Sequence, residues 1–414
     1  MRAFAAGSAF LALALTPLIP VATAQAAPLP SAPAETGTVI KSIRADVDGN
    51  GKPDTVELIR LTANRFRLQV RTAEKVASVE FTADPADVLD ATRVWHGAAS
   101  LDGVKGAELV VNLWSAQRLQ ADLWSHDIAV YTWRHGALVA ERAPAATRVK
   151  HWYLGDPETD STQGYRFFTK SGRHYVDVSD LTRTSTSWKG RITGSVWRNG
   201  NWVKVSTRKV QLPFSKADPY LSFNGPTILL GTLRADIDGD GRTDQLTYYR
   251  YSLGSKNASR YGVRIATAAG RILTKKLSAL PEDPFTGVAT LDGVPGGELI
   301  FLTDNELQNW TVLTWRGGSL VKEPAPKMCA RDYAKWSGCS DEDITNLTFS
   351  VVEGTPTLVV TDIYADGAPG VATLEKFSWQ SNQWAKVSQW TEQLTQEQVD
   401  VLATGFFGVG IVKP

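Results

Sequence analysis

Two stretches decide the fold: RADVDGNGKPD at residues 44–54 and RADIDGDGRTD at residues 234–244. They start 190 residues apart and are identical at 7 of their 11 positions. The same offset relates LDGVKGAELVV at 101–111 to LDGVPGGELIF at 291–301. Two motifs that recur at the same spacing indicate that a long segment of the chain is internally duplicated.

A third pair of motifs sets the limits of the duplication. YTWRHGALV at 131–139 matches LTWRGGSLV at 313–321 at an offset of 182. The two copies therefore run over 37–225 and 226–414, and the first copy holds about eight additional residues.

Most segments between these motifs have the composition of strands. They are short, rich in β-branched and aromatic residues, and separated by Gly, Asn or Asp. The best helix candidate is residues 391–403. Inside each copy the motif recurs after 54 residues, so that Asp48 and Asp54 correspond to Asp102 and Glu108.

The repeat length predicts an all-β protein built as a β-propeller. Four-stranded units of about 60 residues give three blades per copy and six in all, in a single domain over 37–414. Neither half could close a ring alone. Seven blades, or two β-sandwich domains with one per copy, are the alternatives.

The Asp-rich loops have the composition of a calcium site. Oxygen-bearing side chains fall at positions 1, 3, 5 and 9, and a main-chain carbonyl is available at position 7. Glycines at positions 4 and 6 permit the tight turn, and Ca²⁺ takes six to eight oxygen ligands. The predicted ligands are Asp46, Asp48, Asn50, Lys52 (carbonyl) and Asp54, and then Asp236, Asp238, Asp240, Arg242 (carbonyl) and Asp244. The fourth carboxylate of the second loop predicts tighter binding there.

An EF-hand and a turn that binds nothing are the alternatives. Glu57 falls at the twelfth position of an EF-hand loop, but Thr247 takes that place in the second loop. Pro53 and the strand-like flanks also argue against an EF-hand. We therefore expect two structural Ca²⁺ sites between strands.

The D-x-D-G-[ND]-G-x-x-D loop resembles the FG-GAP/VCBS-type repeat family, whose propellers include the head of the integrin alpha subunit. The resemblance implies that the loop joins two strands of a blade and that the ten residues given above hold calcium. It also implies an exported bacterial protein of no assigned activity. The related turns at 100–108 and 290–298 depart from the pattern, because Val104 and Val294 replace the oxygen ligand at position 5. We expect these turns to keep the fold without the metal.

The N-terminal segment has the pattern of an export signal. Arg2 precedes a short apolar stretch, and Ala24-Gln25-Ala26 fits a cleavage site. Residues 1–26 are thus predicted to be a removed signal peptide, and 27–36 a Pro/Ala-rich lead. No Cys is placed to carry a lipid anchor, and no stretch has transmembrane length. The prediction is a secreted protein.

Charge and motifs narrow the function. Lys and Arg number 44 against 43 Asp and Glu, so the chain lacks the basic surface that nucleic acids require. The sequence has no nucleophile-elbow or phosphate-loop motif, and its five histidines are expected in solvated loops or at blade edges. We expect a monomeric, non-catalytic binding or scaffold module at the cell exterior, with an unknown protein or glycan as partner. A carbohydrate-binding propeller, suggested by 14 Trp, or a secreted hydrolase or lyase are the alternatives.

Two further features belong to only one copy. The additional segment at 112–127 brings together candidate partner-binding residues: Trp114, Arg118, Trp124 and His126. A longer hairpin that packs its tryptophans on the blade below is the other interpretation. Cys329 and Cys339 are the only cysteines, and export predicts that they form a disulfide.

Overall fold

Alternating burial shows how the sequence makes its sheets. In strand β3 (Arg65–Arg71) Phe66, Leu68 and Val70 are fully buried, and the residues between them are more exposed. Successive strand residues point to opposite faces, so one face of this sheet packs on the core. In β5 (Trp95–Ala99) every residue is buried, because this strand lies between packed sheets.

These features come from a computed structural model, which describes residues 36–83, 94–113, 126–144, 151–155, 161–221, 223–224, 227–253, 259–279, 285–304, 309–328, 336–337, 343–364, 371–402 and 406–407.

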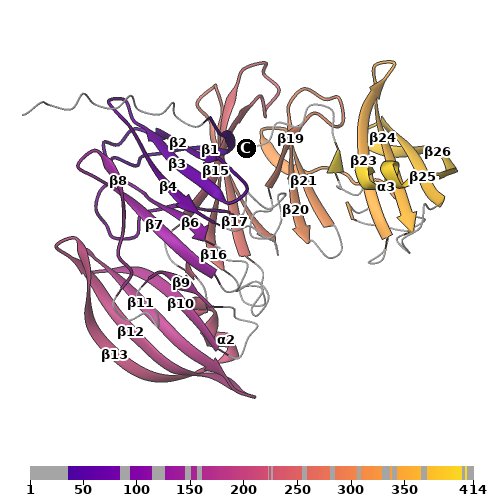
Figure 1. The fold of residues 1–414 in the computed structure, drawn as a ribbon. Helices are drawn as coiled ribbons and strands as arrows, with labels where there is room; N and C mark the ends of the chain where they lie inside the picture. Colours follow the sequence, from indigo (N-terminus) through magenta and orange to yellow (C-terminus); the bar gives the residue numbers. More distant parts are fainter. Residues whose placement is uncertain are drawn as a thin grey trace, which may run out of the picture. The chain divides into compact units, whose positions relative to one another are not determined.

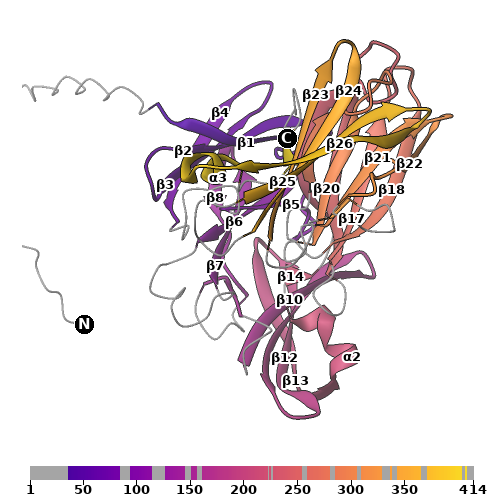
Figure 2. The same ribbon diagram turned by 90° about the vertical axis from the view of Figure 1, so that its right-hand side faces the viewer.

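The first copy contains three four-stranded antiparallel meanders (Figures 1 and 2). We number the meanders 1 to 6 along the chain. Meander 1 is β1 (Thr38–Ala45), β2 (Asp54–Arg60), β3 and β4 (Val76–Thr82). Meander 2 is β5, β6 (Glu108–Leu113), β7 (His126–Arg134) and β8 (Ala137–Ala140). Meander 3 is β10 (Ser161–Lys170), β11 (Arg173–Arg183), β12 (Ser187–Arg198) and β13 (Asn201–Pro213).

The second copy repeats this order. Meander 4 is β15 (Ile228–Ala235), β16 (Asp244–Leu253), β17 (Ser259–Ala266) and β18 (Ile272–Ala279). Meander 5 is β19 (Phe285–Ala289), β20 (Glu298–Asp304), β21 (Asn309–Arg316) and β22 (Ser319–Lys322). Meander 6 is β23 (Asp343–Val352), β24 (Thr355–Tyr364), β25 (Val371–Gln380) and β26 (Gln383–Gln393).

Short elements complete each copy at equivalent places. β14 (Phe223–Asn224) pairs in parallel with β10, and β27 (Phe406–Phe407) pairs in parallel with β23. The two-residue strand β9 (Tyr153–Leu154) pairs with β7. Helices are few in the described residues: α2 (Phe214–Ala217), the 3-10 turn η2 (Asp218–Tyr220) and α3 (Gln396–Leu402), which lies inside the predicted helical stretch. None of these helices is long and apolar enough to cross a bilayer.

This strand order confirms an all-β protein of the propeller type. Each meander pairs its strands in sequential order, as a propeller blade does, whereas the Greek-key sandwich reorders its strands. The described strands hold six such meanders, three in each copy. No pairing between the described strands joins meander 1 to meander 6, so the closed six-bladed ring stays a prediction.

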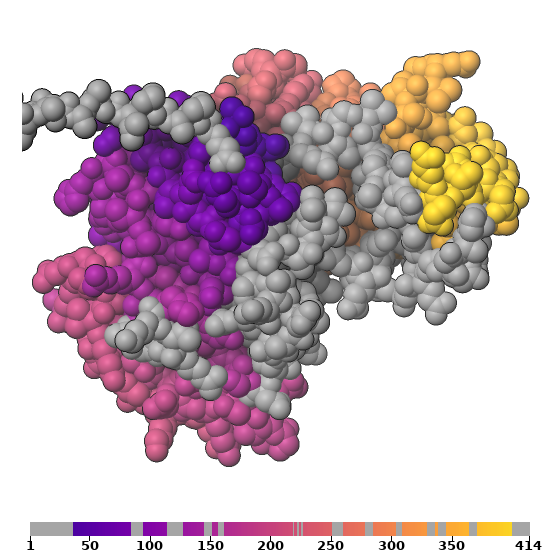
Figure 3. Space-filling view, in the orientation of Figure 1, coloured from indigo at the N-terminus to yellow at the C-terminus, as the bar shows by residue number. Residues whose placement is uncertain are grey.

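Neighbouring meanders share apolar cores. Ile43 and Phe66 of meander 1 pack in one cluster with Leu109 and Tyr131 of meander 2, and these two meanders lie side by side in Figure 3. A larger cluster joins meanders 2 to 5, and a third joins meanders 5 and 6. Burial of apolar side chains between sheets is therefore the main stabilising contribution to the repeat.

Contacts between the two copies centre on the first strands of their meanders. Leu229 of β15 pairs with Ala98 of β5, which merges meanders 2 and 4 into one sheet. The buried Lys41 of β1 donates to the Tyr248 hydroxyl of β16 at 2.7 Å. The Trp95 indole donates to the Leu230 carbonyl oxygen at 3.0 Å. Specific polar contacts thus fix the register between the copies.

Candidate functional site

The first Asp-rich loop connects β1 to β2 and is held by its own carboxylates. The two oxygens of Asp46 accept hydrogen bonds from the Gly49 and Gly51 amides, each at 2.9 Å. Asp54, the first residue of β2, accepts from the Val47 amide at 2.9 Å and from the Asp48 amide at 3.2 Å. The position of the loop between two strands confirms that it is not an EF-hand.

The glycines of this loop are required by its backbone. Gly49 and Gly51 have φ of 78° and 83°, in the left-handed region that residues with a Cβ rarely adopt. A Cβ at Gly49 would also lie 2.6 Å from the Lys105 carbonyl oxygen. The D-G-x-G spacing therefore encodes a turn that wraps its oxygens inward.

The predicted ligands of the first loop come together. Asp46, Asp48 and Asp54 each offer an oxygen within 4.8 Å of the others. Asn50 lies in the same turn, where its amide group donates to Asp48 at 2.9 Å and its side-chain oxygen accepts from the Lys52 amide at 2.7 Å. Several hard oxygens in one turn fit the ligand preference of Ca²⁺.

The second loop, between β15 and β16, repeats this geometry. Asp236 accepts from the Gly239 and Gly241 amides at 2.9 Å each, and Asp244 accepts from the Ile237 amide at 2.9 Å. The carboxylates of Asp236, Asp238 and Asp244 again lie within 4.8 Å of one another.

One predicted ligand of the second loop has a competing partner. The Arg242 guanidinium contacts the Asp240 carboxylate at 2.5 Å and lowers the pKa of that carboxyl group. The additional carboxylate of this loop is therefore already neutralised by its neighbour. The charge of Asp240 therefore does not by itself predict tighter Ca²⁺ binding at the second loop than at the first.

Burial and mutual repulsion act on the carboxylates of both loops. Burial raises the pKa of Asp54, against hydrogen bonds from the Val47 and Asp48 amides that lower it. Burial also raises the pKa of Asp238, and the neighbouring charges of Asp244 and Asp240 add to this effect. A bound cation would relieve this repulsion.

Each Asp-rich loop is attached to the first turn of the next meander. The Ala107 amide of meander 2 donates to the Asp46 carbonyl oxygen at 2.8 Å, and the Gly297 amide of meander 5 donates to the Asp236 carbonyl oxygen at 2.8 Å. A Cβ at Gly106 would lie 2.3 Å from the Val47 carbonyl oxygen, so the two turns are in close contact. The carboxylates of Asp46 and Asp236 thus accept hydrogen bonds within their own loop. Their main-chain carbonyl oxygens accept hydrogen bonds from the neighbouring meander.

The turn at 100–108 keeps one carboxylate contact of the Asp-rich loops. Glu108 accepts from the Leu101 amide at 2.7 Å, just as Asp54 accepts from Val47. In the second copy Glu298 accepts from Leu291 at the same distance. The carboxylate at position 9 therefore stabilises the turn through this hydrogen bond, and it does so whether or not positions 1 and 5 carry an oxygen-bearing side chain.

A buried cluster of carboxylates, which none of the sequence motifs described above predicts, adjoins this contact. Asp102, Glu108 and Glu141 are 2%, 1% and 7% exposed, and their oxygens lie within 4.8 Å of one another. Arg134 contacts Asp102 at 2.5 Å, and the Trp202 indole donates to Glu141 at 2.8 Å. We call this set, with Arg134, the 102/108/141 cluster.

The two buried glutamates of this cluster favour their protonated forms. Burial, and then the charge of Asp102, raises the pKa of Glu108 to about 8. Burial, and then the charge of Glu108, raises the pKa of Glu141 to about 8. Three carboxyl groups therefore share one guanidinium in a region from which water is largely excluded.

The second copy builds a related cluster from Asp292, Glu298, Glu323 and Arg316, which we call the 292/298/323 cluster. Arg316 is hydrogen-bonded to Asp292 and lies 3.8 Å from Glu323. Burial raises the pKa of Glu298 to about 7 and that of Glu323 to about 8. The repeat itself held the signal, because Glu141 and Glu323 end the matched segments YTWRHGALVAE and LTWRGGSLVKE.

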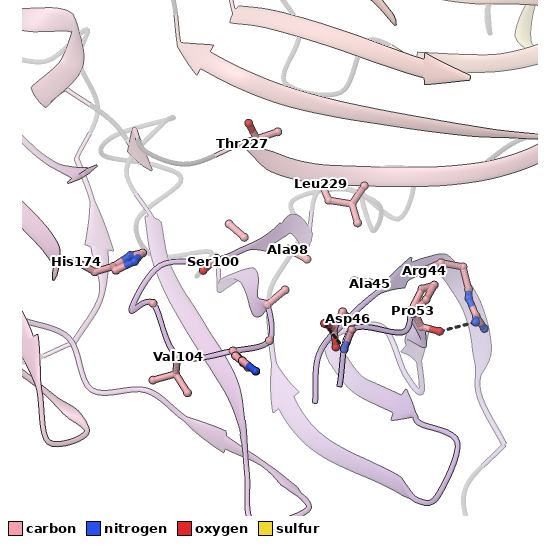
Figure 4. Close-up of a pocket in the computed structure, with 16 residues that line it drawn as sticks. Arg44, Ala45, Asp46, Pro53, Ala98, Ser100, Val104, His174, Thr227 and Leu229 are labelled. Atoms are coloured by element: carbon pink, nitrogen blue, oxygen red, sulfur yellow. Dashed lines mark hydrogen bonds between the residues drawn. The ribbon is translucent and has the colours of Figure 1, made fainter. Parts of the chain in front are cut away.

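A hollow of about 650 Å³ lies beside the first Asp-rich loop (Figure 4). Its lining includes Arg44, Asp46, Lys105, His174 and Leu229, from both copies of the chain. Arg44 donates to the Pro53 carbonyl oxygen at 2.5 Å, as Figure 4 shows, and so lies against the loop. No Trp, Tyr or Phe lines the hollow among the residues described, so it lacks a large aromatic stacking surface. Its lining combines charged side chains with small and apolar ones, such as Ala98 and Val104.

Several predicted residues fall outside the described part of the chain. These are Trp114, Arg118 and Trp124 of the additional segment, Cys329 and Cys339 of the expected disulfide, and the predicted signal peptide. His126 begins β7 and pairs with Leu154.

His96 is not solvated, but it lies in β5, the first strand of meander 2. This residue is 5% exposed, and Arg250 of the second copy donates to its ring nitrogen at 2.8 Å. His151 is exposed as expected and contacts Asp127 at 2.8 Å. His96 is therefore part of the contact between the copies.

Packing accounts for most of the described tryptophans. Trp95, Trp152, Trp188, Trp202, Trp310, Trp336 and Trp384 are all buried. Trp390 is the described tryptophan with a large exposed fraction, 39%. The high tryptophan count is thus largely a property of the core.

Comparisons with known proteins find only remote structural likeness. No protein-family model matches the sequence, and no curated protein matches it. Among solved structures, AofleA from Arthrobotrys oligospora is 11% identical with a TM-score of 0.23, over 87% of this chain and 89% of its own. The fucose-specific lectin from Aleuria aurantia is 11% identical with a TM-score of 0.23, over 87% and 98%. The alpha-L-arabinanase from Penicillium chrysogenum is 13% identical with a TM-score of 0.26, over 80% and 91%. The architecture described above therefore rests on the strand pairing itself.

Proposed function

We propose that this protein is a calcium-stabilised, non-catalytic binding or scaffold module that acts at the cell exterior. The observation that carries the proposal is the recurrence of one loop geometry, 190 residues apart, in both copies. In each loop three carboxylates converge within 4.8 Å, and the first carboxylate is held by two glycine amides. A turn that needed only to reverse the chain would not require three converging charges.

Two further observations support the role of calcium. Both loops contact the next meander through a main-chain hydrogen bond, so a bound ion would stabilise a contact between meanders as well as a turn. The resemblance to FG-GAP/VCBS-type repeats supports the same ion at the same positions. The predicted signal peptide supports export to an environment where Ca²⁺ is abundant.

The partner would bind at the hollow beside the first loop or at the additional segment 112–127. The hollow combines Arg44, Lys105 and His174 with Asp46, which favours a polar partner surface. Its lack of aromatic side chains, within the part of the chain described, favours a protein over a stacked sugar ring. A substrate screen without turnover would be consistent with this role.

Removal of both first ligands should abolish most of the calcium-dependent stabilisation. The variant carries Asp46→Ala and Asp236→Ala, and thermal unfolding is measured with millimolar Ca²⁺ and with EGTA. A dissociation constant of about 10⁻⁴–10⁻³ M gives about 0.4–1.4 kcal/mol per site, so the double variant should lose about twice that amount.

Glu74→Ala is the matched control, because Glu74 is an exposed acid outside both loops. It should keep the full calcium-dependent shift. A double variant whose shift equals that of the wild type would show that the loops do not bind the ion.

Removal of the ion pair between Arg242 and Asp240 should strengthen calcium binding at the second loop. Arg242→Ala removes the guanidinium that contacts Asp240, so we expect calcium affinity at this loop to rise about two- to fivefold. Lys52→Ala at the same position of the first loop is the comparison, and calorimetric titration of each variant is the measurement. An unchanged affinity in Arg242→Ala would mean that Asp240 is not a ligand.

A further inference from the structure

The 102/108/141 cluster contains a buried carboxylate oxygen that accepts no hydrogen bond. Glu141 is 7% exposed, and only its Oε1 accepts a hydrogen bond, from the Trp202 indole. Its Oε2 is buried and has no hydrogen-bond partner. The same residue lies within 4.8 Å of ligand atoms of Asp102 and Glu108. A buried carboxylate oxygen without a partner costs free energy unless another group occupies the space beside it.

The charge of the cluster indicates which kind of group would occupy the space beside Oε2 of Glu141. Asp102, Glu108 and Glu141 carry three negative charges when ionised, and Arg134 is the cation that acts on them. Two negative charges remain, which one divalent cation would neutralise. The donors are all hard carboxylate oxygens, of the kind that Ca²⁺ prefers to softer ligands.

We propose that the 102/108/141 cluster is a third, interior cation site, in which Asp102, Glu108 and Glu141 bind a divalent cation of the Ca²⁺ type. The ion lies between meanders 2 and 3, because Asp102 and Glu108 belong to the first turn of meander 2 and Trp202, which holds Glu141, belongs to meander 3. It is separate from the two Asp-rich loops and uses the turn that lost the ligand at position 5. The site would tie meander 2 to the meander that follows it.

The second copy supplies a matched comparison. The triad of Asp292, Glu298 and Glu323 is not among the described groups whose ligand atoms converge within 4.8 Å. Both carboxylate oxygens of Glu323 are buried without a hydrogen-bond partner, as Oε2 of Glu141 is, and Glu323 lies 3.8 Å from Arg316. The Trp384 indole, which corresponds to Trp202, is buried and donates no hydrogen bond to Glu323. Convergence of three carboxylate ligands, which among the described residues the first copy shows and the second does not, therefore assigns the interior ion to the first copy.

Calorimetric titration with Ca²⁺ tests the site in a chain that lacks the two loops. The background variant is Asp46→Ala with Asp236→Ala, and we expect it to bind one Ca²⁺ per chain. Addition of Glu141→Gln should weaken that remaining binding at least tenfold, because one of three ligand charges is lost. Addition of Glu323→Gln should leave it unchanged.

Two results would overturn the proposal. The first is a background variant that binds no Ca²⁺, and the second is an equal loss with Glu141→Gln and Glu323→Gln. In either case the loss of two ions on going from the wild type to the background variant would still support the calcium loops. If Glu141→Gln instead raises the melting temperature in EGTA and Ca²⁺ has no effect, protons occupy the cluster and the cation site is rejected.

A second measurement does not depend on a Glu141 variant that folds. Trp202 contacts Glu141 at 2.8 Å, so Tb³⁺ in this site should show luminescence excited through tryptophan. We expect this signal in the background variant, and a loss of most of it in Trp202→Phe. Its absence from the background variant would contradict the site.

Discussion

Phe223→Ala should lower the free energy of unfolding by about 3–5 kcal/mol, the range for truncation of a buried aromatic side chain. Phe223 is 2% exposed and lies at the centre of a group of rings. Its ring centroid is 4.9 Å from that of Phe167, 5.8 Å from that of Tyr165 and 5.3 Å from that of His96. The loss is large because these neighbours come from different meanders and cannot all move into the cavity.

The position of Phe223 in the chain adds to this expectation. It lies in β14, whose pairing with β10 ends the first copy just before β15 begins the second. Denaturant unfolding followed by tryptophan fluorescence is the measurement. Phe214→Ala is the control, because Phe214 is 39% exposed and should cost less than about 1 kcal/mol. Equal losses in the two variants would contradict the packing role of β14.

The second large effect is a loss of stability as the pH rises. Glu298 and Glu323 have pKa values of about 7 and about 8 in the folded protein, where burial favours the neutral forms. In the unfolded chain both groups ionise near pH 4.5. Their stabilising contribution is therefore complete below about pH 4.5 and is lost as the pH rises to about 8. The slope is at most about 1.4 kcal/mol per pH unit for each group.

Glu323→Gln should make this decline shallower, because the variant cannot ionise at that position. Melting temperatures of the calcium-free protein between pH 4.5 and 8.5 test this. The charged groups that face Glu323 are Asp292, Glu298 and Arg316, and all are unchanged in the variant. Glu392→Gln, at an exposed position in β26, should follow the wild-type curve. Parallel curves for wild type and Glu323→Gln would show that this carboxyl group is already ionised in the folded protein.

The sequence predicted the parts of the fold that repeat. The 190-residue duplication, the four-stranded units and the loop between two strands all follow from local patterns, because turn residues and strand periodicity are written in adjacent positions. The contacts between the copies, such as His96 with Arg250 or Lys41 with Tyr248, could not be predicted in this way. They join residues about 150 to 200 positions apart that share no motif.

The candidate site was likewise predictable only where its residues are close in sequence. The carboxylates of the Asp-rich loops are close in sequence, and their spacing alone indicates their convergence. The 102/108/141 cluster draws on the β5–β6 turn, on Arg134 and on a residue after β8, and it is completed by Trp202 from meander 3. Its only signal was the repetition of Glu141 at Glu323, which shows that a glutamate is common to both copies without showing its partners.

The hydrogen bond from the Ala107 amide to the Asp46 carbonyl oxygen bears on how such a repeat can diverge. It is made by main-chain atoms on both sides, so most substitutions at either residue leave it in place. Side chains of the turn at 100–108 could therefore change, and position 5 could become Val104, while the stacking of neighbouring turns was inherited unaltered. Meanders held together in this way can lose recognisable similarity to one another long before they lose their arrangement.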